Sequence, residues 1–214
     1  MISDNAMVIA MPQSKLNVAI FDLDHTLIHT DLLYEQFLIA LKKNPLLIFK
    51  IIVALLHGKL TLKKYLSEVA PIQAEDLPYN DQVLEKLRIF KKQGLSCFLV
   101  SASWHTEVTK IADHLGLFTA AYGSNESVNL KGENKLKFIQ EHWGHQHWAY
   151  IGDSQYDLAI WKKANHAICV NASSQTVRKL QSLNNQHEVI HNKKNIFLSF
   201  FKAIRIHQWV KNIL

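Results

Sequence analysis

Two carboxylates stand two positions apart, directly after a short apolar run. Residues 18–21 read Val-Ala-Ile-Phe, and the chain continues Asp22-Leu23-Asp24-His25-Thr26. Such a run is typical of a buried parallel strand, and side chains two residues apart leave an extended chain on the same side. One carboxylate can then attack an electrophile while the other handles protons. The structural alternative is that Asp24 and Thr26 only cap a following helix.

A second acidic group follows another apolar run, residues 147–151. It reads Gly152-Asp153-Ser154-Gln155-Tyr156-Asp157. Ligands of open α/β sheets gather at the carboxyl ends of the strands, so we expect Asp153 and Asp157 to converge on the same edge as Asp22 and Asp24. Carboxylates gathered there repel one another unless a hard cation is present, and Mg²⁺ prefers oxygen ligands. The sequence therefore predicts a magnesium site.

A hydroxyl and a lysine complete the set of candidate residues. Ser101 ends a third apolar run, and its alternative role is to cap the helix that begins near Trp104, a role that Ser103 can take instead. Lys135 opens a helical pattern that leads toward the Gly152 strand, and its charge can offset that of a phosphate. Lys131 competes with Lys135 for this role. A lone lysine is more often a solvated surface residue.

The elements that position these residues alternate between strand and helix. Strands are predicted over residues 18–21, 95–100, 147–151 and 166–170, and helical patterns follow with polar starts near Asp153 and Ser173. This order predicts an α/β fold with a doubly wound parallel sheet, that is, a Rossmann-like core.

The connection between the first two strands is far longer than one crossover needs. It carries helical patterns over residues 32–41, 46–57 and 61–69, with Gly58 as a helix stop and Thr61 as a helix start. We therefore expect an inserted helical cap. The predicted division is a core over residues 14–30 and 81–192, a cap over residues 31–80 and a basic tail over residues 193–214.

Composition and charge narrow the class of protein. The two cysteines, Cys97 and Cys169, lie in apolar runs, which favours buried thiols in a reducing cytosol over a disulfide scaffold. Residues 1–15 lack the pattern of a signal peptide, so a cytoplasmic protein is expected. The net charge of +6 is compatible with nucleic acid, but no recognised nucleic-acid-binding motif is present.

The positive charge is concentrated in two stretches that interleave lysines with large apolar side chains. No acidic residue occurs between Gln36 and Ser67, and none follows Glu188. The apolar run 45–56 is interrupted by Lys50 and is too short to span a bilayer, so no complete transmembrane segment is predicted. These stretches favour contact with an anionic membrane surface, and the alternative is a cap whose apolar face packs on the core and whose lysines are solvated.

Taken together, the candidate residues resemble the haloacid dehalogenase superfamily of hydrolases. Its four ordered motifs match Asp22, Asp24 and Thr26; Ser101; Lys135; and Gly152, Asp153 and Asp157. The resemblance implies a phosphatase in which Asp22 attacks phosphorus, Asp24 protonates the leaving oxygen and later deprotonates water, and Thr26 steadies the pair. It also implies that Ser101 and Lys135 hold the phosphoryl oxygens.

The same resemblance implies the ligands of the metal. Mg²⁺ would be held by the Asp22 carboxylate, the Asp24 backbone carbonyl and Asp153, with Asp157 as a ligand through water or as support for the others. The position of the cap resembles the phosphoserine-phosphatase branch, but Asp31 stands where that branch carries a glutamate, so serine phosphate is disfavoured. Asp24 argues against the dehalogenase branch, which has no oxygen leaving group to protonate.

A closer resemblance is to phosphatase domains fused ahead of UbiA-like membrane prenyltransferases. It rests on three segments: residues 77–80 (Leu-Pro-Tyr-Asn), 129–132 (Asn-Leu-Lys-Gly) and 205–212 (Arg-Ile-His-Gln-Trp-Val-Lys-Asn). It implies a polyprenyl-linked phosphorylated sugar as substrate, a C-terminal prenyltransferase membrane domain as partner, and a place at the inner face of a membrane. The rivals are a catalytically silent membrane-recruitment module and a soluble phosphatase of small metabolites.

Overall fold

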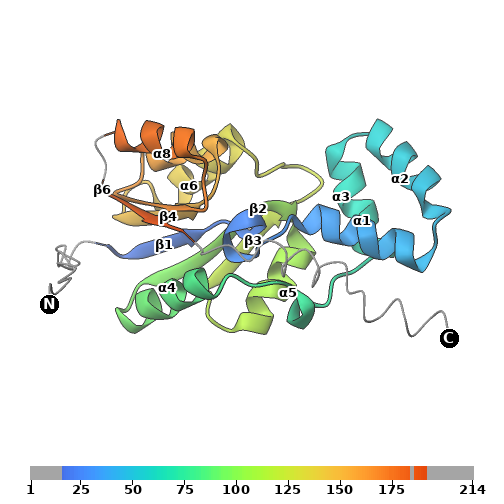
Figure 1. Ribbon diagram of the computed structural model, residues 1–214, viewed down its shortest axis with the longest axis horizontal. Coiled ribbons are helices and arrows are strands. Elements are labelled where there is room, and N and C mark those ends of the chain that lie inside the picture. Colours follow the sequence, from blue (N-terminus) through green and yellow to red (C-terminus); the bar gives the residue numbers. More distant parts are fainter. Residues whose placement is uncertain (1–15, 184–185, 192–214) are drawn as a thin grey trace, which may run out of the picture.

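The core of the molecule is a parallel sheet. The computed structural model describes residues 16–183 and 186–191, and within them six strands pair in the order β3-β2-β1-β4-β5-β6, every pair parallel (Figure 1). The strands are β1 Val18–Phe21, β2 Ser96–Trp104, β3 Ala120–Ser124, β4 Trp148–Gly152, β5 His166–Val170 and β6 Gln186–Ile190. The predicted doubly wound parallel sheet is confirmed.

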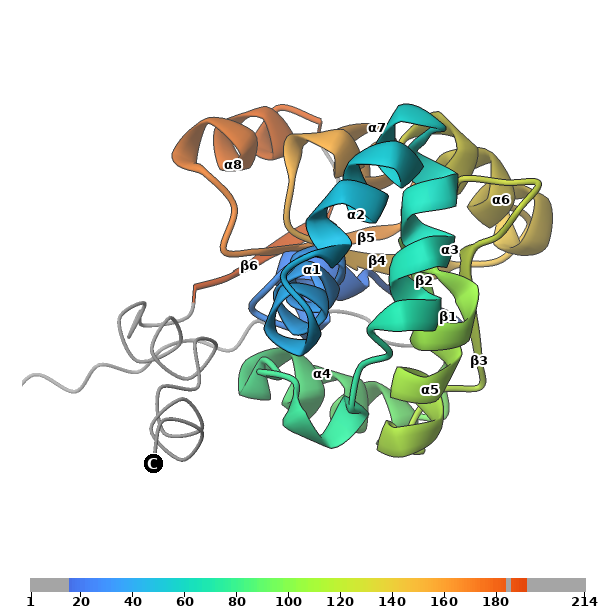
Figure 2. The ribbon, with the colours of Figure 1, turned by 90° about the vertical axis from the view of Figure 1, so that its right-hand side faces the viewer.

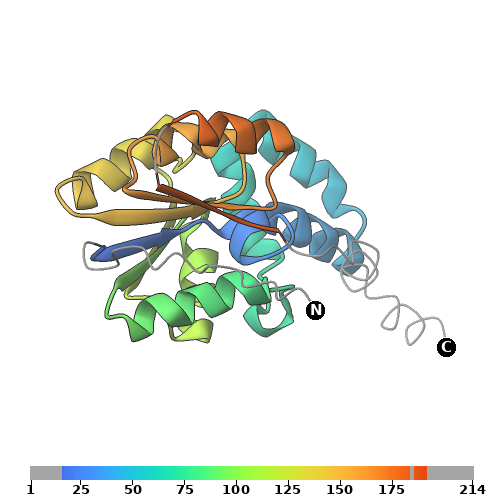
Figure 3. The same cartoon turned by 60° about the vertical axis from the view of Figure 1, so that its left-hand side comes forward.

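Helices cover both faces of the sheet. Figure 3 shows α4 and α5 below the sheet and α6 and α8 above it. Their bounds are α4 Asp81–Lys92, α5 His105–Leu115, α6 Glu133–Trp143, α7 Leu158–Trp161 and α8 Ser174–Gln181. Alternate strand residues serve the two layers: Ala19 and Phe21 pack with α4 and α5, whereas Val18 and Ile20 pack with α6 and α7. This burial on both faces explains the continuous apolar runs of the inner strands.

Some predicted boundaries were wrong. The strand predicted over residues 95–100 runs on to Trp104, and that predicted over residues 147–151 is shifted by one residue. The outer strands β3 and β6 were not predicted. Both are only partly buried and contain small or polar residues, so neither carries an apolar signal.

Three helices between β1 and α4 form a separate group beyond the carboxyl edge of the sheet (Figures 1 and 2). They are α1 Leu32–Lys43, α2 Leu47–Leu56 and α3 Lys59–Val69, and they enclose a small apolar cluster that includes Ala40, Ile51 and Leu66. α3 begins at Lys59 and not at Thr61, because Gly58 makes the turn with a φ of 120°. We call residues 31–80 the helical insertion.

The two ends of the helical insertion run side by side. Ile28 and Tyr79 form an isolated antiparallel bridge. The His29 amide donates to the Pro78 carbonyl and the Asn80 amide to the Leu27 carbonyl, each at 2.9 Å. The chain therefore leaves and re-enters the core through one short pair of segments.

Two further expectations bear on the described residues. Cys97 and Cys169 are buried and free. Among residues 16–183 and 186–191, no helix has both the length and the apolar character needed to cross a bilayer. The predicted basic tail, residues 193–214, lies outside the described residues, as does the segment 205–212.

Candidate active site

Asp22 is the first residue after β1, at the carboxyl edge of the sheet. Its backbone amide donates to the Ile151 carbonyl at 2.8 Å, which continues the pairing with β4 by one residue. Its Oδ1 accepts a hydrogen bond from the Leu23 amide at 2.7 Å. The chain then turns sharply through Leu23–Leu27, where His25 has a φ of 55°. Strand pairing and this turn together fix the direction of the carboxylate.

Lys135 pairs with Asp22 in the interior. Its Nζ lies 2.8 Å from Asp22 Oδ2, and its side chain is 5% exposed, so the ion pair is shielded from water. Burial alone would lower the pKa of Lys135, but the Asp22 and Asp157 carboxylates outweigh it and raise that pKa, so the lysine stays charged. Lys131 is exposed and lies over the Tyr156 ring, 5.3 Å from its centroid. Of the two competing lysines, the structure therefore brings Lys135 to Asp22.

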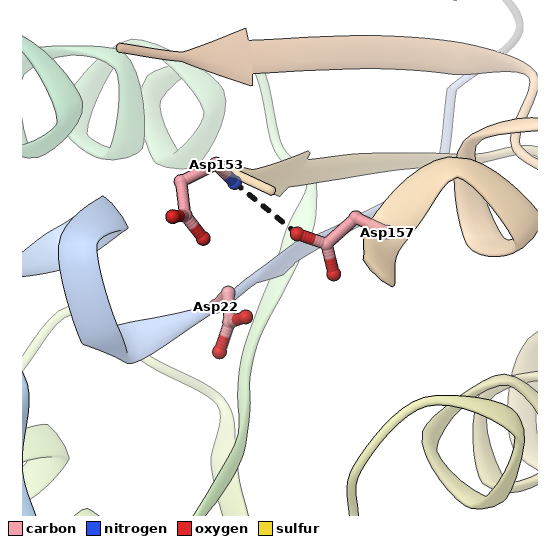
Figure 4. A group of neighbouring side chains, drawn as sticks. All are labelled: Asp22, Asp153 and Asp157. Carbon is pink, nitrogen blue, oxygen red and sulfur yellow. Dashed lines mark hydrogen bonds between the residues drawn. The ribbon is translucent and has the colours of Figure 1, made fainter. Parts of the chain in front are cut away.

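Three carboxylates gather beside this ion pair. Asp22, Asp153 and Asp157 each offer an oxygen within 4.8 Å of the others, and Figure 4 shows them turned toward a common space. Asp157 is held by the Asp153 and Ser154 amides at 3.2 and 3.1 Å and by the Tyr150 hydroxyl at 2.9 Å. These donors fix the carboxylate before any ligand binds.

Gly152 is required for this arrangement. A Cβ on residue 152 would lie 2.7 Å from Asp157 Oδ2 and 2.8 Å from the Tyr150 ring. Contacts that short do not occur in folded proteins, so a larger residue would displace the carboxylate. The glycine expected at the head of this motif therefore makes room for its last aspartate.

The donor set suits a hard divalent cation. Burial, and then the neighbouring Asp22 and Asp157 charges, raise the pKa of Asp153 to about 8. Burial likewise raises the pKa of Asp22, against the opposing effect of Lys135. Three acids and one contacting lysine leave an excess of negative charge, and the ligand atoms are all oxygen, as Mg²⁺ prefers. The residues present therefore fit a divalent metal.

Asp24 lies apart from the three acids and has partners of its own. Its Oδ1 accepts from the Leu32 amide at 2.8 Å, and its Oδ2 accepts from the Ser103 hydroxyl at 2.9 Å. Burial, then the Asp31 and Asp22 charges, raise the pKa of Asp24 to about 6. A carboxyl with that pKa can exchange a proton near neutral pH.

Ser101 and Ser103 have roles other than helix capping. α5 begins after Trp104, which makes no side-chain capping hydrogen bond, so neither serine caps this helix, and the alternative role considered for them is not observed. Ser101 Oγ lies 3.5 Å from Asp24 Oδ2 and accepts from the Ser103 amide at 3.0 Å. Both hydroxyls thus reach the site, because β2 bends at its end beside β3.

Thr26 is buried, and within the described residues its Oγ1 has no hydrogen-bond partner. Its backbone carbonyl accepts from the Asn80 side chain at 3.2 Å. The residue that caps α1 is Asp31, whose Oδ1 accepts from the Tyr34 amide at 3.1 Å, although the bond from the Leu32 amide to Asp24 also helps to start that helix. Thr26 is therefore next to the acids without a hydrogen bond to them.

Lys63 was missed as a site residue by the sequence reasoning, which counted it only among the lysines of the first basic stretch. It extends from α3 to the core, where its Nζ donates to the Ala102 carbonyl at 2.6 Å and to Asn129 Oδ1 at 3.0 Å. Ser124 Oγ donates to the same Ala102 carbonyl at 2.6 Å and lies 3.2 Å from Asn129 Oδ1. Burial lowers the pKa of Lys63 to about 8, although Asp24 opposes the shift. Nothing in its sequence context separates it from Lys59 or Lys64, because its burial depends on the packing of the insertion.

Comparison with known proteins identifies a family and a relative for this chain. A family model described as haloacid dehalogenase-like hydrolase matches residues 19–162. The uncharacterized protein y4nM of Sinorhizobium fredii (strain NBRC 101917 / NGR234) is 34% identical over 196 residues, which cover 91% of this chain. The chain spans 38% of the length of that relative.

Solved structures share the fold at low identity. A protein of unknown function from Bordetella pertussis Tohama I superposes with a TM-score of 0.62 at 17% identity, over 82% of this chain and 98% of that one. A phosphoserine phosphatase, solved as a phospho-aspartyl intermediate analogue, gives 0.54 at 19% identity, over 87% and 98%. A predicted phosphatase from Clostridium acetobutylicum gives 0.57 at 17%, over 88% and 99%. At these identities the likeness concerns the fold.

Proposed function

Because this chain belongs to the haloacid dehalogenase-like hydrolase family, we propose that it is a Mg²⁺-dependent phosphomonoester hydrolase with Asp22 as its nucleophile. The observation that carries the proposal is the buried pair of Asp22 and Lys135, with an Oδ2–Nζ distance of 2.8 Å, at the edge of three converging carboxylates. A nucleophilic carboxylate, a fixed cation and a metal-binding acidic cluster are what displacement at a phosphoryl group requires.

The proposed reaction has two displacements. Asp22 attacks phosphorus and forms an acyl phosphate, while the Asp24 carboxyl gives its proton to the departing oxygen. Asp24 then takes a proton from water, which attacks the acyl phosphate and releases inorganic phosphate and the Asp22 carboxylate. Lys135, with Ser101, would hold the phosphoryl oxygens during both steps. The similar phosphoserine phosphatase was solved as a phospho-aspartyl intermediate analogue, which is in keeping with this chemistry.

Bound Mg²⁺ would neutralise phosphoryl charge and align the reacting groups. The Asp22, Asp153 and Asp157 carboxylates and the Asp24 backbone carbonyl are the proposed ligands. In this arrangement Asp24 serves the metal through its main chain and the substrate through its side chain. That division is compatible with the hydrogen bonds to its carboxylate from Leu32 and Ser103.

We further propose a polyprenyl-linked phosphorylated sugar as substrate, met at the cytoplasmic face of a membrane. The support is the resemblance of residues 77–80, 129–132 and 205–212 to the phosphatase domains fused to UbiA-like prenyltransferases, together with the basic, apolar insertion. The match covers only 38% of the Sinorhizobium fredii relative, so that protein has room for a further domain. Serine phosphate remains disfavoured as the substrate, since Asp31, which stands where the phosphoserine-phosphatase branch has a glutamate, uses its carboxylate to cap α1.

The test is phosphate release from an aryl phosphate with Mg²⁺, with EDTA, and in Asp22→Asn. We expect release with Mg²⁺ alone and its loss in the variant, because an amide cannot form the acyl phosphate. Asp113→Asn, an exposed change on α5, is the matched control and should keep full activity. Full activity in Asp22→Asn contradicts the proposed nucleophile, and no release by the wild type favours the silent-module alternative.

A further inference from the structure

The outer helix of the insertion exposes an unusual amount of apolar surface. Six large apolar side chains of α2 and its flank are between 47% and 80% exposed: Leu46, Phe49, Ile52, Val53, Leu55 and Leu56. Leu46, Phe49, Val53 and Leu56 recur every three or four residues, so they form one stripe along the helix. The opposite side, with Ile51 and Ala54, packs into the apolar cluster of the insertion. We call the exposed side the α2 surface.

A hollow opens beside this stripe, between α2 and α3. It has a volume of about 400 Å³, and its walls include Phe49, Val53 and Tyr65. Lys63, which points to the core, is half a helical turn from Thr61 and Tyr65 on α3. The hollow therefore faces away from the candidate active site and is not a substrate cleft of that site.

The charge around the α2 surface has one sign. Lys50 lines the hollow beside the stripe and Lys59 stands at the start of α3, both exposed, and no acidic residue occurs between Gln36 and Ser67. A second copy of this chain would place the same lysines against each other in a symmetric contact. Residues 192–214 are basic and contain no acid, so they are equally poor as an occupant. The fitting occupant is apolar and anionic.

We propose that the α2 surface docks on a bilayer that contains anionic lipids. α2 has 10 residues and is about 15 Å long, too short to cross the apolar core of a bilayer but suited to lie within its interface. The leucines and Phe49 enter the acyl region, the lysines meet the lipid phosphates, and the hollow receives part of an acyl chain. This inference rests on the proposed function, since docking would bring the active site to a lipid-linked phosphate at the bilayer surface.

The docking also fits the placement of the insertion. α2 lies at the far end of the molecule from β6 and α8 (Figure 1), whereas α3 makes the contacts with the core. Docking through α2 therefore leaves the ion pair of Lys64 with Glu126 and the bonds of Lys63 to the core unchanged.

The experiment is cosedimentation of the full chain with phosphatidylcholine vesicles, with and without phosphatidylglycerol, at low and high salt. We expect preference for the anionic vesicles, weakened by salt. Lys50→Gln with Lys59→Gln should reduce the binding constant about 30-fold at low salt, from about 1 kcal/mol per lysine. Phe49→Gln with Leu56→Gln should reduce binding to both kinds of vesicle. Ile89→Gln with Lys92→Glu on α4 is the matched control and should bind like the wild type.

Wild-type binding by both α2 variants overturns the proposal, as does equal binding of the wild type to neutral and anionic vesicles. Self-association of the wild type that the α2 variants abolish, without vesicle binding, would assign the surface to a second copy instead. Aryl phosphate hydrolysis without lipid is measured in parallel and should be unchanged in every α2 variant. If the wild type hydrolyses no aryl phosphate, the proposed function is contradicted, but vesicle binding that depends on the α2 surface would still support the docking.

Discussion

At the scale of single residues, Asp22 and Asp24 differ through their neighbours. Asp22 is paired with Lys135 and faces two other acids, whereas Asp24 accepts hydrogen bonds from Leu32 and Ser103 and has a pKa raised to about 6 by burial and by nearby acids. Burial raises the pKa of Asp22, and the ion pair with Lys135 opposes that shift and favours the charged carboxylate that the proposed attack needs. The raised pKa of Asp24 favours a carboxyl that can give up a proton, as the proposed mechanism needs. Two identical side chains thereby have different surroundings, which suit the two roles that we propose for them.

This difference predicts a burst in Asp24→Asn. An aryl leaving group departs without a proton, so the variant should release about one equivalent of the aryl alcohol and then turn over slowly, since water is no longer deprotonated. An alkyl phosphate needs the proton and should react about 10² to 10⁴ times more slowly than with the wild type. Stopped-flow absorbance and phosphate release measure the two steps. Unchanged turnover of the alkyl phosphate would show that Asp24 transfers no proton.

Lys135→Met tests the charge balance of the acidic cluster. Removing one partner of a buried ion pair costs about 3–5 kcal/mol, here because Asp22 would be left without its cation, buried beside two other acids. Added Mg²⁺ should restore more of the melting temperature in Lys135→Met than in the wild type. Lys131→Met, which removes an exposed lysine, should melt like the wild type with and without Mg²⁺. A lack of any Mg²⁺ effect on both proteins would argue against a metal at these acids.

At the scale of elements, the helical insertion is held to the core by α3. Lys63 makes two hydrogen bonds to the core in a partly buried place, whereas Lys64 and Glu126 form an ion pair with side chains 46% and 70% exposed. Hydrogen bonds of a charged group contribute about 1.5–3 kcal/mol, and exposed ion pairs about 0–1 kcal/mol. Of the two neighbouring lysines, Lys63 is the one that fixes the insertion.

Lys63→Met should therefore loosen α3 without unfolding the core. We expect hydrogen exchange of the α3 amides to rise about tenfold or more, with that of β1 and β4 unchanged, because local opening needs only these contacts to break. Lys64→Met is the control, and its exchange should stay near that of the wild type. Equal exchange in the two variants would assign the attachment to the apolar contacts instead.

The sequence predicts inner elements better than outer ones. β5 was predicted with its observed bounds, because a strand buried on both faces must be apolar throughout. β3 and β6 lie at the two edges of the sheet and bury less, so their residues obey no such demand. The site residues divide in the same way. Asp22 and Asp153 were predicted because they follow apolar strands that meet at one edge of the sheet. Ser103 and Lys63 were not, because their places depend on the irregular end of β2 and on the packing of α3 against the core.

At the scale of the whole molecule, Glu188 connects the edge strand β6 to helix α4 through an ion pair. Its Oε2 accepts from Lys86 of α4 at 2.6 Å and lies 3.8 Å from His166 Nε2. The neighbouring His166 ring, and then the hydrogen bond from Lys86, lower the pKa of Glu188 to about 2, although burial opposes the shift. A carboxyl with a lowered pKa in the folded state stabilises the protein above its ordinary pKa and ceases to do so as pH falls toward 2.

Glu188→Gln should consequently melt below the wild type at pH 6, by roughly 2–4 °C, for a loss of about 1 kcal/mol from a half-exposed pair. The gap should close as pH falls from about 4.5 to 2, since the wild type then loses the same charge. Calorimetry at several pH values measures it. Glu141→Gln removes a more exposed ion pair with Lys137 and should show no comparable gap. A gap that persists at pH 2 would mean that packing, and not charge, explains the loss.

The paired segments at the base of the insertion have an evolutionary consequence. Residues 27–29 and 78–80 are joined to each other by hydrogen bonds, so the sheet receives the same two chain ends whatever lies between them. A gene that lengthens, trims or replaces the intervening codons leaves the strand order and the acids at the sheet edge intact. Selection can then change the insertion without changing the acids of the candidate active site. The insertion and the acid cluster are inherited here as separable parts of one open reading frame.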